Sequence, residues 1–251
     1  LKGKLEFQNV SFSYPDTGLV GMDNISFQIN PGESLGVIGS TGSGKSTIAN
    51  SILRLFDIKS GKILVDGVNI KNLDISFYRK QIGYVPQDVF LFSDTIKNNI
   101  LFGCESSDFR KVEKAAEDSD LIRNIDSFPN KYDTMIGERG ITLSGGQKQR
   151  ISIARAIIKE PRILILDDCL SAVDTNTENI ILENLKKIMV DRTTIVISHR
   201  ISSVKLAKQI LVIEEGKVIE KGSHKELIKM EGHYHKLYIK QIEEEKMLKI
   251  S

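Results

Sequence analysis

The stretch that determines the fold is Leu35-Gly-Val-Ile-Gly39-Ser-Thr-Gly-Ser-Gly44-Lys-Ser-Thr47. Its apolar start predicts a short buried strand over 35–38, and a helix is expected over 47–55. The residues between them fit G-x-x-x-x-G-K-[ST], a phosphate-loop pattern. Glycines let backbone N–H groups converge on phosphate oxygens, and the N-terminus of the next helix attracts the same anion. We therefore predict a nucleotide site rather than a chance glycine-rich turn, with Lys45 on the β- and γ-phosphates and Ser46 on Mg²⁺.

Length and composition narrow the possible classes of protein. The 251 residues suffice for one large domain or for a core with a sizeable insertion. The net charge of +2, from 35 basic and 33 acidic residues, gives no electrostatic reason to expect nucleic acid as a partner. Cys104 and Cys169 lack metal-type spacing, which favours a reduced cytosolic setting. No apolar run is long enough to span a bilayer, and no signal peptide begins the chain. The first residue is Leu1 rather than Met and a strand is expected to begin at Lys2, so we expect a soluble domain cut from a longer polypeptide.

Strand and helix patterns predict an α/β fold, a P-loop core with a mainly parallel central sheet. Alternating strands over 5–14 and 22–29 form an expected antiparallel β layer before the phosphate loop. A strand at 61–65 leads into an Asp66-Gly67 hairpin turn, and a short strand follows at 82–86. Helical spacing then dominates from Asp94 to Lys159, and strands over 210–213 and 217–220 are expected to form a final hairpin at Glu215-Gly216. We expect a single domain over 1–251, with the core at 1–87 and 160–251 and an inserted helical subdomain at 88–159.

Several polar residues stand at element ends in the second half of the chain. Leu143-Ser-Gly-Gly-Gln147 opens a predicted helix over 148–158; by itself it favours an ordinary helix cap over an anion site. The apolar strand 163–166 runs into Asp167 and Asp168, where a carboxylate can bind Mg²⁺. His199 follows a predicted strand over 193–197. Tyr14, at the end of a strand, fits a core position and an adenine-stacking position equally well.

With these motifs together, the chain resembles the nucleotide-binding domain of an ATP-binding cassette (ABC) transporter of the exporter type, over nearly all its length. The resemblance rests on motifs that match the family's Walker A, Q-loop, signature, Walker B, D-loop and H-loop: Gly39 to Ser46, Gln87, Leu143 to Gln147, Ile163 to Asp167, Ser171 to Asp174, and His199. The segment Gly137 to Gly140 is similar to an exporter segment that touches the membrane domains.

The resemblance implies a head-to-tail dimer, homomeric or heteromeric, with two ATP molecules at its interface and membrane domains attached. ATP closes the dimer and hydrolysis reopens it, which drives export at the cytoplasmic face of a membrane. The implied Mg²⁺ ligands are Ser46, Gln87 and Asp167, and the implied catalytic residues are Asp168, His199 and Gln87. The implied nucleotide-binding residues are Tyr14, Gly39, Ser40, Thr41, Gly42, Ser43, Gly44, Lys45, Ser46 and Thr47 of one copy, with Ser144, Gly145, Gly146 and Gln147 reaching the nucleotide of the other.

The chain departs from the family pattern at Asp168, where the family carries a glutamate that activates the attacking water. Aspartate is shorter by one C–C bond, about 1.5 Å, and misplacement on the scale of 1 Å can cost about a hundredfold in rate. One interpretation is an active enzyme that tolerates aspartate. We favour the other, in which this chain is the degenerate-site half of a heterodimeric exporter and its intact signature completes the competent site of the partner.

Two other functions are weighed against this one. Soluble cassette ATPases that act on DNA or ribosomes usually carry a long coiled-coil insertion or two cassettes, and neither is present here. The near-neutral charge also disfavours them. A regulatory subunit with little turnover would differ from a motor domain in the ATPase rate of the assembled dimer.

Overall fold

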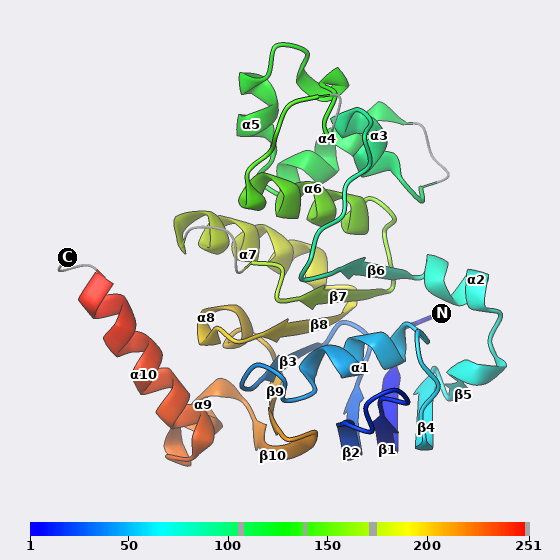
Figure 1. The fold of residues 1–251 in the computed structure, drawn as a ribbon, viewed down its shortest axis with the longest axis vertical. Helices are drawn as coiled ribbons and strands as arrows, with labels where there is room; N and C mark the ends of the chain where they lie inside the picture. The colour runs from blue at the N-terminus through cyan, green and yellow to red at the C-terminus, as the bar shows by residue number, and fades with distance from the viewer. Residues whose placement is uncertain (105–107, 138–139, 171–174, 249–251) are drawn as a thin grey trace. The chain divides into compact units, whose positions relative to one another are not determined.

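The computed structural model describes residues 1–104, 108–137, 140–170 and 175–248, and it has the predicted α/β architecture (Figure 1). The chain divides into two compact units: residues 1–75 with 193–251, and residues 76–192. The division predicted from the sequence, with an insertion at 88–159, has different boundaries and stays a prediction.

The first unit contains the strand that leads into the phosphate loop, the strands that pair beside it, and a separate antiparallel layer, with helices between and after the strands. Its elements are β1 (Leu5–Ser13), β2 (Val20–Ile29), β3 (Ser34–Ile38), α1 (Lys45–Ile52), β4 (Ser60–Val65), β5 (Val68–Asn69), the 3₁₀ turn Ile70–Asn72, β8 (Thr193–Ser198), α8 (Ile201–Val204), β9 (Gln209–Glu214), β10 (Lys217–Gly222), α9 (His224–Lys229) and α10 (His233–Leu248).

The predicted antiparallel layer is present, in the strand order β2-β1-β4-β5. Leu5 and Phe7 of β1 are buried, and the Phe7 ring stacks on Phe27 with centroids 4.4 Å apart. The strict alternation predicted over 5–14 breaks at Asn9, which has a φ of 52°, so the next buried residues are Val10 and Phe12. A β-bulge inserts one residue and thereby shifts which side chains face the core.

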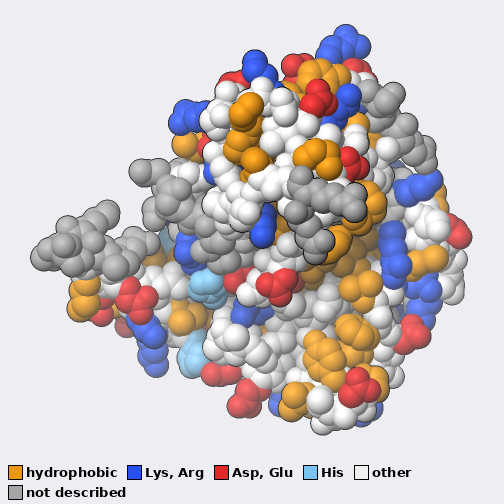
Figure 2. Space-filling view, turned by 45° about the horizontal axis from the view of Figure 1, so that its top comes forward, with side chains coloured by type: hydrophobic (Ala, Val, Ile, Leu, Met, Phe, Trp, Pro, Cys, Tyr) orange, Lys and Arg blue, Asp and Glu red, His pale blue; other side chains and the backbone are white. Residues whose placement is uncertain are grey.

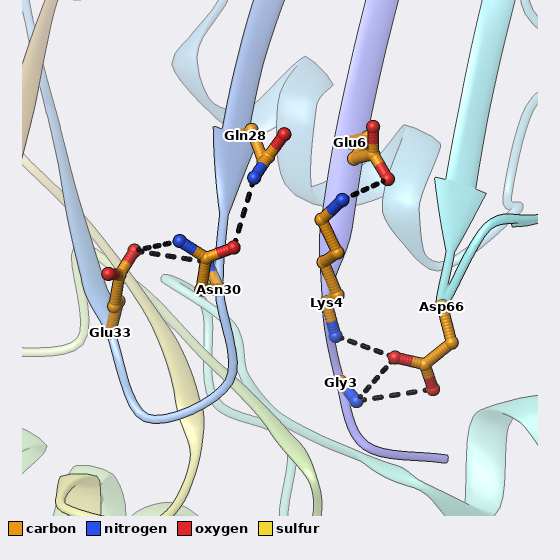
Figure 3. Close-up of polar contacts among 7 residues, drawn as sticks. All are labelled: Gly3, Lys4, Glu6, Gln28, Asn30, Glu33 and Asp66. Carbon is orange, nitrogen blue, oxygen red and sulfur yellow. Dashed lines mark hydrogen bonds and ion pairs between the residues drawn. The ribbon is translucent and has the colours of Figure 1, made fainter.

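A carboxylate clip fixes the start of β1 (Figure 3). Asp66, in the β4–β5 turn, accepts hydrogen bonds from the backbone N–H groups of Lys2, Gly3 and Lys4 at 2.6, 3.0 and 2.9 Å. Burial raises the pKa of Asp66, but these hydrogen bonds outweigh burial and leave it below its usual value. The charged form of Asp66 therefore anchors the N-terminal strand.

The strand that precedes the phosphate loop is central in its sheet. β3 pairs in parallel with β8 on one side and β9 on the other, and β10 pairs antiparallel with β9. The β9–β10 hairpin predicted from the sequence is confirmed, with positive φ at Glu215 and Gly216 (48° and 77°) as a primed turn requires. Leu35, Val37 and Ile38 are fully buried, which explains the unbroken apolar run.

The second unit holds most of the helices predicted after residue 94. Its elements are α2 (Ile75–Lys80, which begins at the boundary), β6 (Ile82–Val85), α3 (Ile96–Leu101), α4 (Phe109–Asp118), α5 (Ile122–Ser127), the 3₁₀ turn Lys131–Asp133, α6 (Gly145–Ile157), β7 (Ile163–Asp167) and α7 (Thr175–Met189). β6 and β7 pair in parallel, and α6 packs on β6, α3 and α4. A buried apolar stripe of α6, including Ile151, Ala154 and Ile157, makes these contacts.

Two helix boundaries differ from the prediction. The helix after the phosphate loop begins at Lys45 and ends at Ile52, whereas the sequence pattern suggested 47–55. It ends early because Arg54 adopts a φ of 52° and the N–H of Leu55 bonds back to the carbonyl of Asn50 at 2.9 Å. No glycine marks that end. The helix predicted over 148–158 begins at Gly145, immediately after its cap.

In the described part of the chain, no helix has the length and hydrophobicity needed to cross a bilayer.

Candidate functional site

The predicted phosphate loop joins β3 to α1 in a tight turn that only glycine fits at two points. A Cβ atom on Gly39 would lie 2.1 Å from the carbonyl oxygen of Ile213, and one on Gly44 would lie 2.1 Å from that of Gly21. Gly44 also has a φ of 103°. This close packing against neighbouring backbone fixes the shape of the loop. Loops of this kind bind an anion such as a phosphate group with their backbone N–H groups.

The end of α1 that faces this loop is arranged for an anion. Its cap residue, Gly44, supplies no side-chain hydrogen bond, and its first turn contains no acidic residue. The positive end of the helix dipole is thus not offset by a carboxylate of the first turn. Lys45 folds back over the loop and donates from Nζ to the carbonyl oxygens of Gly39 and Ser40 at 2.9 and 2.7 Å. Its ammonium is therefore held at the loop.

Two glycines outside the predicted motif also shape the loop. Gly21 of β2 packs against Thr47, since a Cβ there would lie 2.8 Å from the Thr47 methyl carbon. Gly216 of the β9–β10 turn donates its N–H to the carbonyl oxygen of Ser43 at 2.9 Å. Sequence reasoning assigned Gly216 only to a hairpin turn and gave Gly21 no role, because nothing local links either residue to the loop.

Tyr14 lies beside the start of α1. Its hydroxyl is 2.9 Å from Oγ1 of Thr47, and its ring meets Phe12 and Phe56 edge-on, with centroids 5.0 and 5.9 Å away. The two predicted nucleotide-binding residues, Tyr14 and Thr47, are thus brought together. The contact of Phe56 with Tyr14 was not predicted, because Phe56 directly follows the predicted helix and belongs to no motif.

His199 emerges beside the phosphate loop. β3 and β8 are parallel and in register, with Ile38 opposite Ser198, so Gly39 and His199 are each the first residue beyond a paired strand end. His199 is exposed and its backbone carbonyl accepts a hydrogen bond from Gln241 of α10 at 2.7 Å. In the first unit, the phosphate loop and His199 therefore lie together at the carboxyl ends of β3 and β8, and Tyr14 lies beside the start of α1.

The second unit holds Gln87, Asp167 and Asp168, which are expected to serve the nucleotide bound by the same copy of the chain. Val85 of β6 lies opposite Leu166 of β7, so Gln87 and Asp167 stand at neighbouring strand ends. Asp167 is buried, and the hydroxyl of Tyr84 donates to its Oδ2 at 3.4 Å. Burial, and then the nearby Asp167 charge, raise the pKa of Tyr84, so this phenol stays a hydrogen-bond donor. Gln87 is exposed.

Asp168 has an unusual backbone. Its φ of 46° lies in the left-handed region, which non-glycine residues seldom occupy, and its side chain is half-buried. The next residue, Cys169, is buried, and burial followed by the Asp168 charge raises the pKa of its thiol. Strain of this kind gathers at functional positions.

The predicted signature forms the cap of α6. Ser144 Oγ accepts from the N–H of Gln147 at 3.3 Å, and Gln147 Oε1 accepts from the N–H of Ser144 at 2.9 Å. This reciprocal pair is a capping box. It explains the early start of the helix and leaves the glycines at 145 and 146 in its first turn, where backbone N–H groups can bind an anion.

A magnesium ion fits this donor set only together with phosphate oxygens. Among the described residues, no cluster of three or more His, Cys, Asp or Glu side chains could hold a metal. Mg²⁺ prefers one or two protein oxygens plus water and substrate phosphates. The hydroxyl of Ser46 and the carboxylate of Asp167 are ligands of that type, but they belong to different units, and their meeting at one ion stays a prediction.

Two predicted motifs fall outside the described residues. These are Ser171 to Asp174 (the D-loop match) and, within the segment 137–140, Glu138 and Arg139.

Comparison with known proteins gives a family model, two relatives and a solved structure that resemble this chain. A family model described as ABC transporter matches residues 22–171. The chain is 48% identical over 239 residues to ATP-binding cassette sub-family B member 6 of Xenopus tropicalis, covering 95% of this chain and 28% of that protein. It is 44% identical over 239 residues to an ATP-dependent lipid A-core flippase of Photobacterium profundum, covering 95% and 41%. A solved bacterial Atm1-family ABC exporter with ATP bound superposes with a TM-score of 0.91 at 39% identity, over 96% of this chain and 42% of that one. The chain thus spans less than half of each of these proteins.

Proposed function

This chain belongs to the ABC transporter family, and we propose that it is the ATP-binding and hydrolysing motor domain of an exporter. The observation that carries the proposal is the phosphate loop between β3 and α1, closed by Gly39 and Gly44 and covered by the ammonium of Lys45. Its similarity to an ABC exporter solved with ATP bound supports the same assignment.

In the proposed site, Tyr14 stacks on the adenine and the loop residues 39–47 hold the phosphates. Lys45 exchanges its two carbonyl contacts for the β- and γ-phosphates, because its ammonium binds an anionic phosphate oxygen more strongly than a neutral carbonyl oxygen. Ser46, Gln87 and Asp167 hold Mg²⁺, which neutralises charge on the phosphates when bound. His199, at the strand end beside the loop, contacts the γ-phosphate.

We propose that the signature of a second nucleotide-binding domain completes each ATP-binding site. Ser144 suits this task because its oxygen already accepts the N–H of Gln147, so its own proton remains available for a phosphate oxygen. The N–H groups of the first turn of α6 add to that contact. ATP thereby closes a head-to-tail dimer, and hydrolysis reopens it.

A pocket in the second unit is the proposed docking point for the membrane domain of the same transporter. It encloses about 420 Å³ and is lined by Val89, Phe90, Leu91, Ile136, Gly137, Ile141, Thr142, Leu143 and Lys148. Phe90 is 68% exposed, one of the most exposed apolar side chains among the described residues, and hydrophobic side chains reach the surface among charged ones in Figure 2. The relatives are more than twice as long as this chain, so a membrane-embedded segment is the natural occupant.

The wall of this pocket is linked to the signature helix. Arg155 of α6 donates to the carbonyl oxygens of Phe90 and Asn99 at 2.9 and 2.8 Å, and to the side chain of Asn99 at 2.9 Å. Burial lowers the pKa of its guanidinium, which still carries its charge at neutral pH. Movement of α6 as the dimer closes would therefore shift the segment after Gln87, which faces the membrane domain in this proposal.

We further propose that the chain's own catalytic site is weak and that its natural partner is a different chain. Asp168 carries a shorter carboxylate than the glutamate expected there, on a strained backbone. The capped signature at Ser144 is intact and would serve the partner's site. A regulatory subunit with little turnover is the second candidate, favoured by the same observation at Asp168. The ATPase rate of the assembled dimer separates the two.

Thermal unfolding with and without Mg·ATP tests the nucleotide site. A ligand at 100 times its Kd stabilises the native state by about 2.7 kcal/mol. For a chain of this size, each kcal/mol raises Tm by about 2–4 °C. We expect a rise of about 5–10 °C in the wild type, none in Lys45→Ala, and the wild-type rise in Lys236→Ala, an exposed lysine on α10. An equal rise in wild type and Lys45→Ala would contradict the assignment.

A further inference from the structure

The carboxyl end of β8 is held by a side chain that lies 40 residues further along the chain. The backbone carbonyl of His199 accepts from Nε2 of Gln241 at 2.7 Å. The N–H of Ile201, two residues on, donates to Oε1 of the same Gln241 at 2.8 Å. One planar amide thus binds the backbone on both sides of Arg200.

This contact supplies a cap that the local sequence lacks. Ile201 begins α8, and its cap residue, Arg200, makes no side-chain cap hydrogen bond. Short helices usually take such a bond from a Ser, Thr, Asp or Asn at that position. Here Gln241 of α10 provides it from outside the helix, and Ser198 Oγ adds a bond from the N–H of Arg200 at 3.0 Å. Together these three bonds fix the backbone at 199–201.

The position of Gln241 is itself determined by how α10 is anchored. The N-terminal N–H groups of α10, at His233 and Tyr234, bind the carboxylate of Glu220 in β10. Tyr234 is fully buried, and its hydroxyl lies 2.8 Å from Nδ1 of His224 in α9. Gln241 follows Tyr234 by seven residues, two helical turns, so both side chains lie on the same face of α10.

We propose that Gln241 is a positioning residue for His199, which makes hydrolysis depend on the docking of α10. The inference rests on the proposed function, in which the imidazole of His199 contacts the γ-phosphate. His199 is exposed, and the backbone from which its ring projects helps to place that ring. Gln241 sets this backbone and does not itself touch the nucleotide. In the proposed function the nucleotide is bound by Tyr14 and the phosphate loop, whereas Gln241 contacts the backbone at His199 and Ile201.

The test compares Gln241→Ala with Glu243→Ala, a change of an exposed residue on the same helix. Steady-state ATPase assays are run in the wild-type background and in Asp168→Glu. For Gln241→Ala we expect kcat to fall about tenfold, less than the roughly hundredfold that a 1 Å misplacement can cost, while the KM for ATP stays unchanged. Glu243→Ala should match its parent. An unchanged kcat in Gln241→Ala, or a loss that appears in KM, would overturn the inference.

Two further measurements separate positioning from general destabilisation. Amide hydrogen exchange without nucleotide should be faster at Ile201 in Gln241→Ala, because its acceptor is gone. In Gln241→Glu the carboxylate still accepts from Ile201 but cannot donate to His199, so exchange at Ile201 should stay slow while kcat falls. Failure of both the wild type and Asp168→Glu to bind ATP would refute the proposed function. The exchange rate at Ile201 would then still decide whether Gln241 holds the backbone at 199–201. An unchanged rate in Gln241→Ala would show that it does not.

Discussion

At the scale of single residues, Asp168 is the position where one methylene group controls the expected chemistry. Its carboxylate stands directly after the Walker B aspartate, on a left-handed backbone with a φ of 46°. A hundredfold loss of rate corresponds to about 2.7 kcal/mol of activation free energy, so one shortened side chain can account for a nearly inactive site.

We therefore expect Asp168→Glu to raise turnover severalfold in a homodimer of this chain, because the carboxylate then reaches the attacking water. Asp168→Asn should abolish the remaining activity, since an amide cannot accept the proton. Single-turnover ATPase assays measure both. The homodimer matters because its intact signature, residues 143–147, faces the altered site. If wild type and Asp168→Glu hydrolyse ATP equally fast, aspartate is a competent base and the degenerate-site proposal is wrong.

Tyr14 allows the ring and the hydroxyl to be tested separately. The ring is the proposed adenine platform, whereas the hydroxyl is bonded to Thr47 at 2.9 Å. Tyr14→Phe keeps the ring, so we expect ATP affinity to fall by no more than a few fold. Tyr14→Leu removes the aromatic face, and a base–aromatic stack is worth about 1–3 kcal/mol, or roughly 5- to 150-fold in affinity. Isothermal titration of Mg·ATP measures both. Equal losses in the two variants would assign binding to the hydroxyl instead.

At the scale of elements, the N-terminal strand is tied down by one carboxylate. Burial raises the pKa of Asp66, but the hydrogen bonds that it accepts from three backbone N–H groups lower this pKa by more. A lowered pKa in the native state means that ionised Asp66 stabilises the fold at any pH above its unfolded-state pKa, about 3.9. This contribution is lost as the pH falls through the native pKa.

Asp66→Asn should accordingly lower Tm at neutral pH, because the amide is a weaker acceptor for the N–H groups of Lys2, Gly3 and Lys4. The difference in Tm between wild type and variant should begin to shrink below about pH 4, where Asp66 of the unfolded wild type takes up a proton, and it should vanish once the native carboxylate is protonated as well. Melting curves from pH 3 to 8 measure it, with Asp16→Asn, an exposed turn residue, as the control. A difference that stays constant across this range would show that charge plays no part in the clip.

At the scale of the whole molecule, each copy of the chain carries half of two proposed sites. The phosphate loop and His199 lie in one unit and the signature in the other, and the proposed dimer places the signature of one copy on the nucleotide of the second. Association should therefore depend on bound ATP.

We expect this chain to be monomeric or weakly dimeric alone and to associate with its partner when ATP is present. Ser144→Arg should block association by placing bulk and charge at the γ-phosphate contact. Ser144→Ala is the matched control, since both variants lose the cap of α6, worth about 1 kcal/mol, but alanine adds no bulk. Sedimentation velocity with and without ATP measures the outcome. A tight dimer without nucleotide, or Ser144→Arg that associates as well as Ser144→Ala, would contradict the model of the interface.

What the sequence determined by itself is local. The strand and phosphate loop with a helix after them, the turn at Asp66-Gly67 and the hairpin at Glu215-Gly216 were all predictable, because glycine preferences and hydrophobic period act within a few residues. Family resemblance then attached functions to those motifs. The cap of α6 was also visible as Ser144 followed by Gln147, although the predicted helix started three residues late.

Only the tertiary structure decided which distant residues meet. The register that places Gly39 beside His199 depends on pairing between strands some 160 residues apart, and hydrophobic period carries no information about partners. The contact of Tyr14 with Thr47, and the approach of Gln241 to the backbone at 199–201, arise in the same way. One or two side-chain hydrogen bonds are too weak to leave a pattern in the sequence, and their partners are selected by the packing of whole elements.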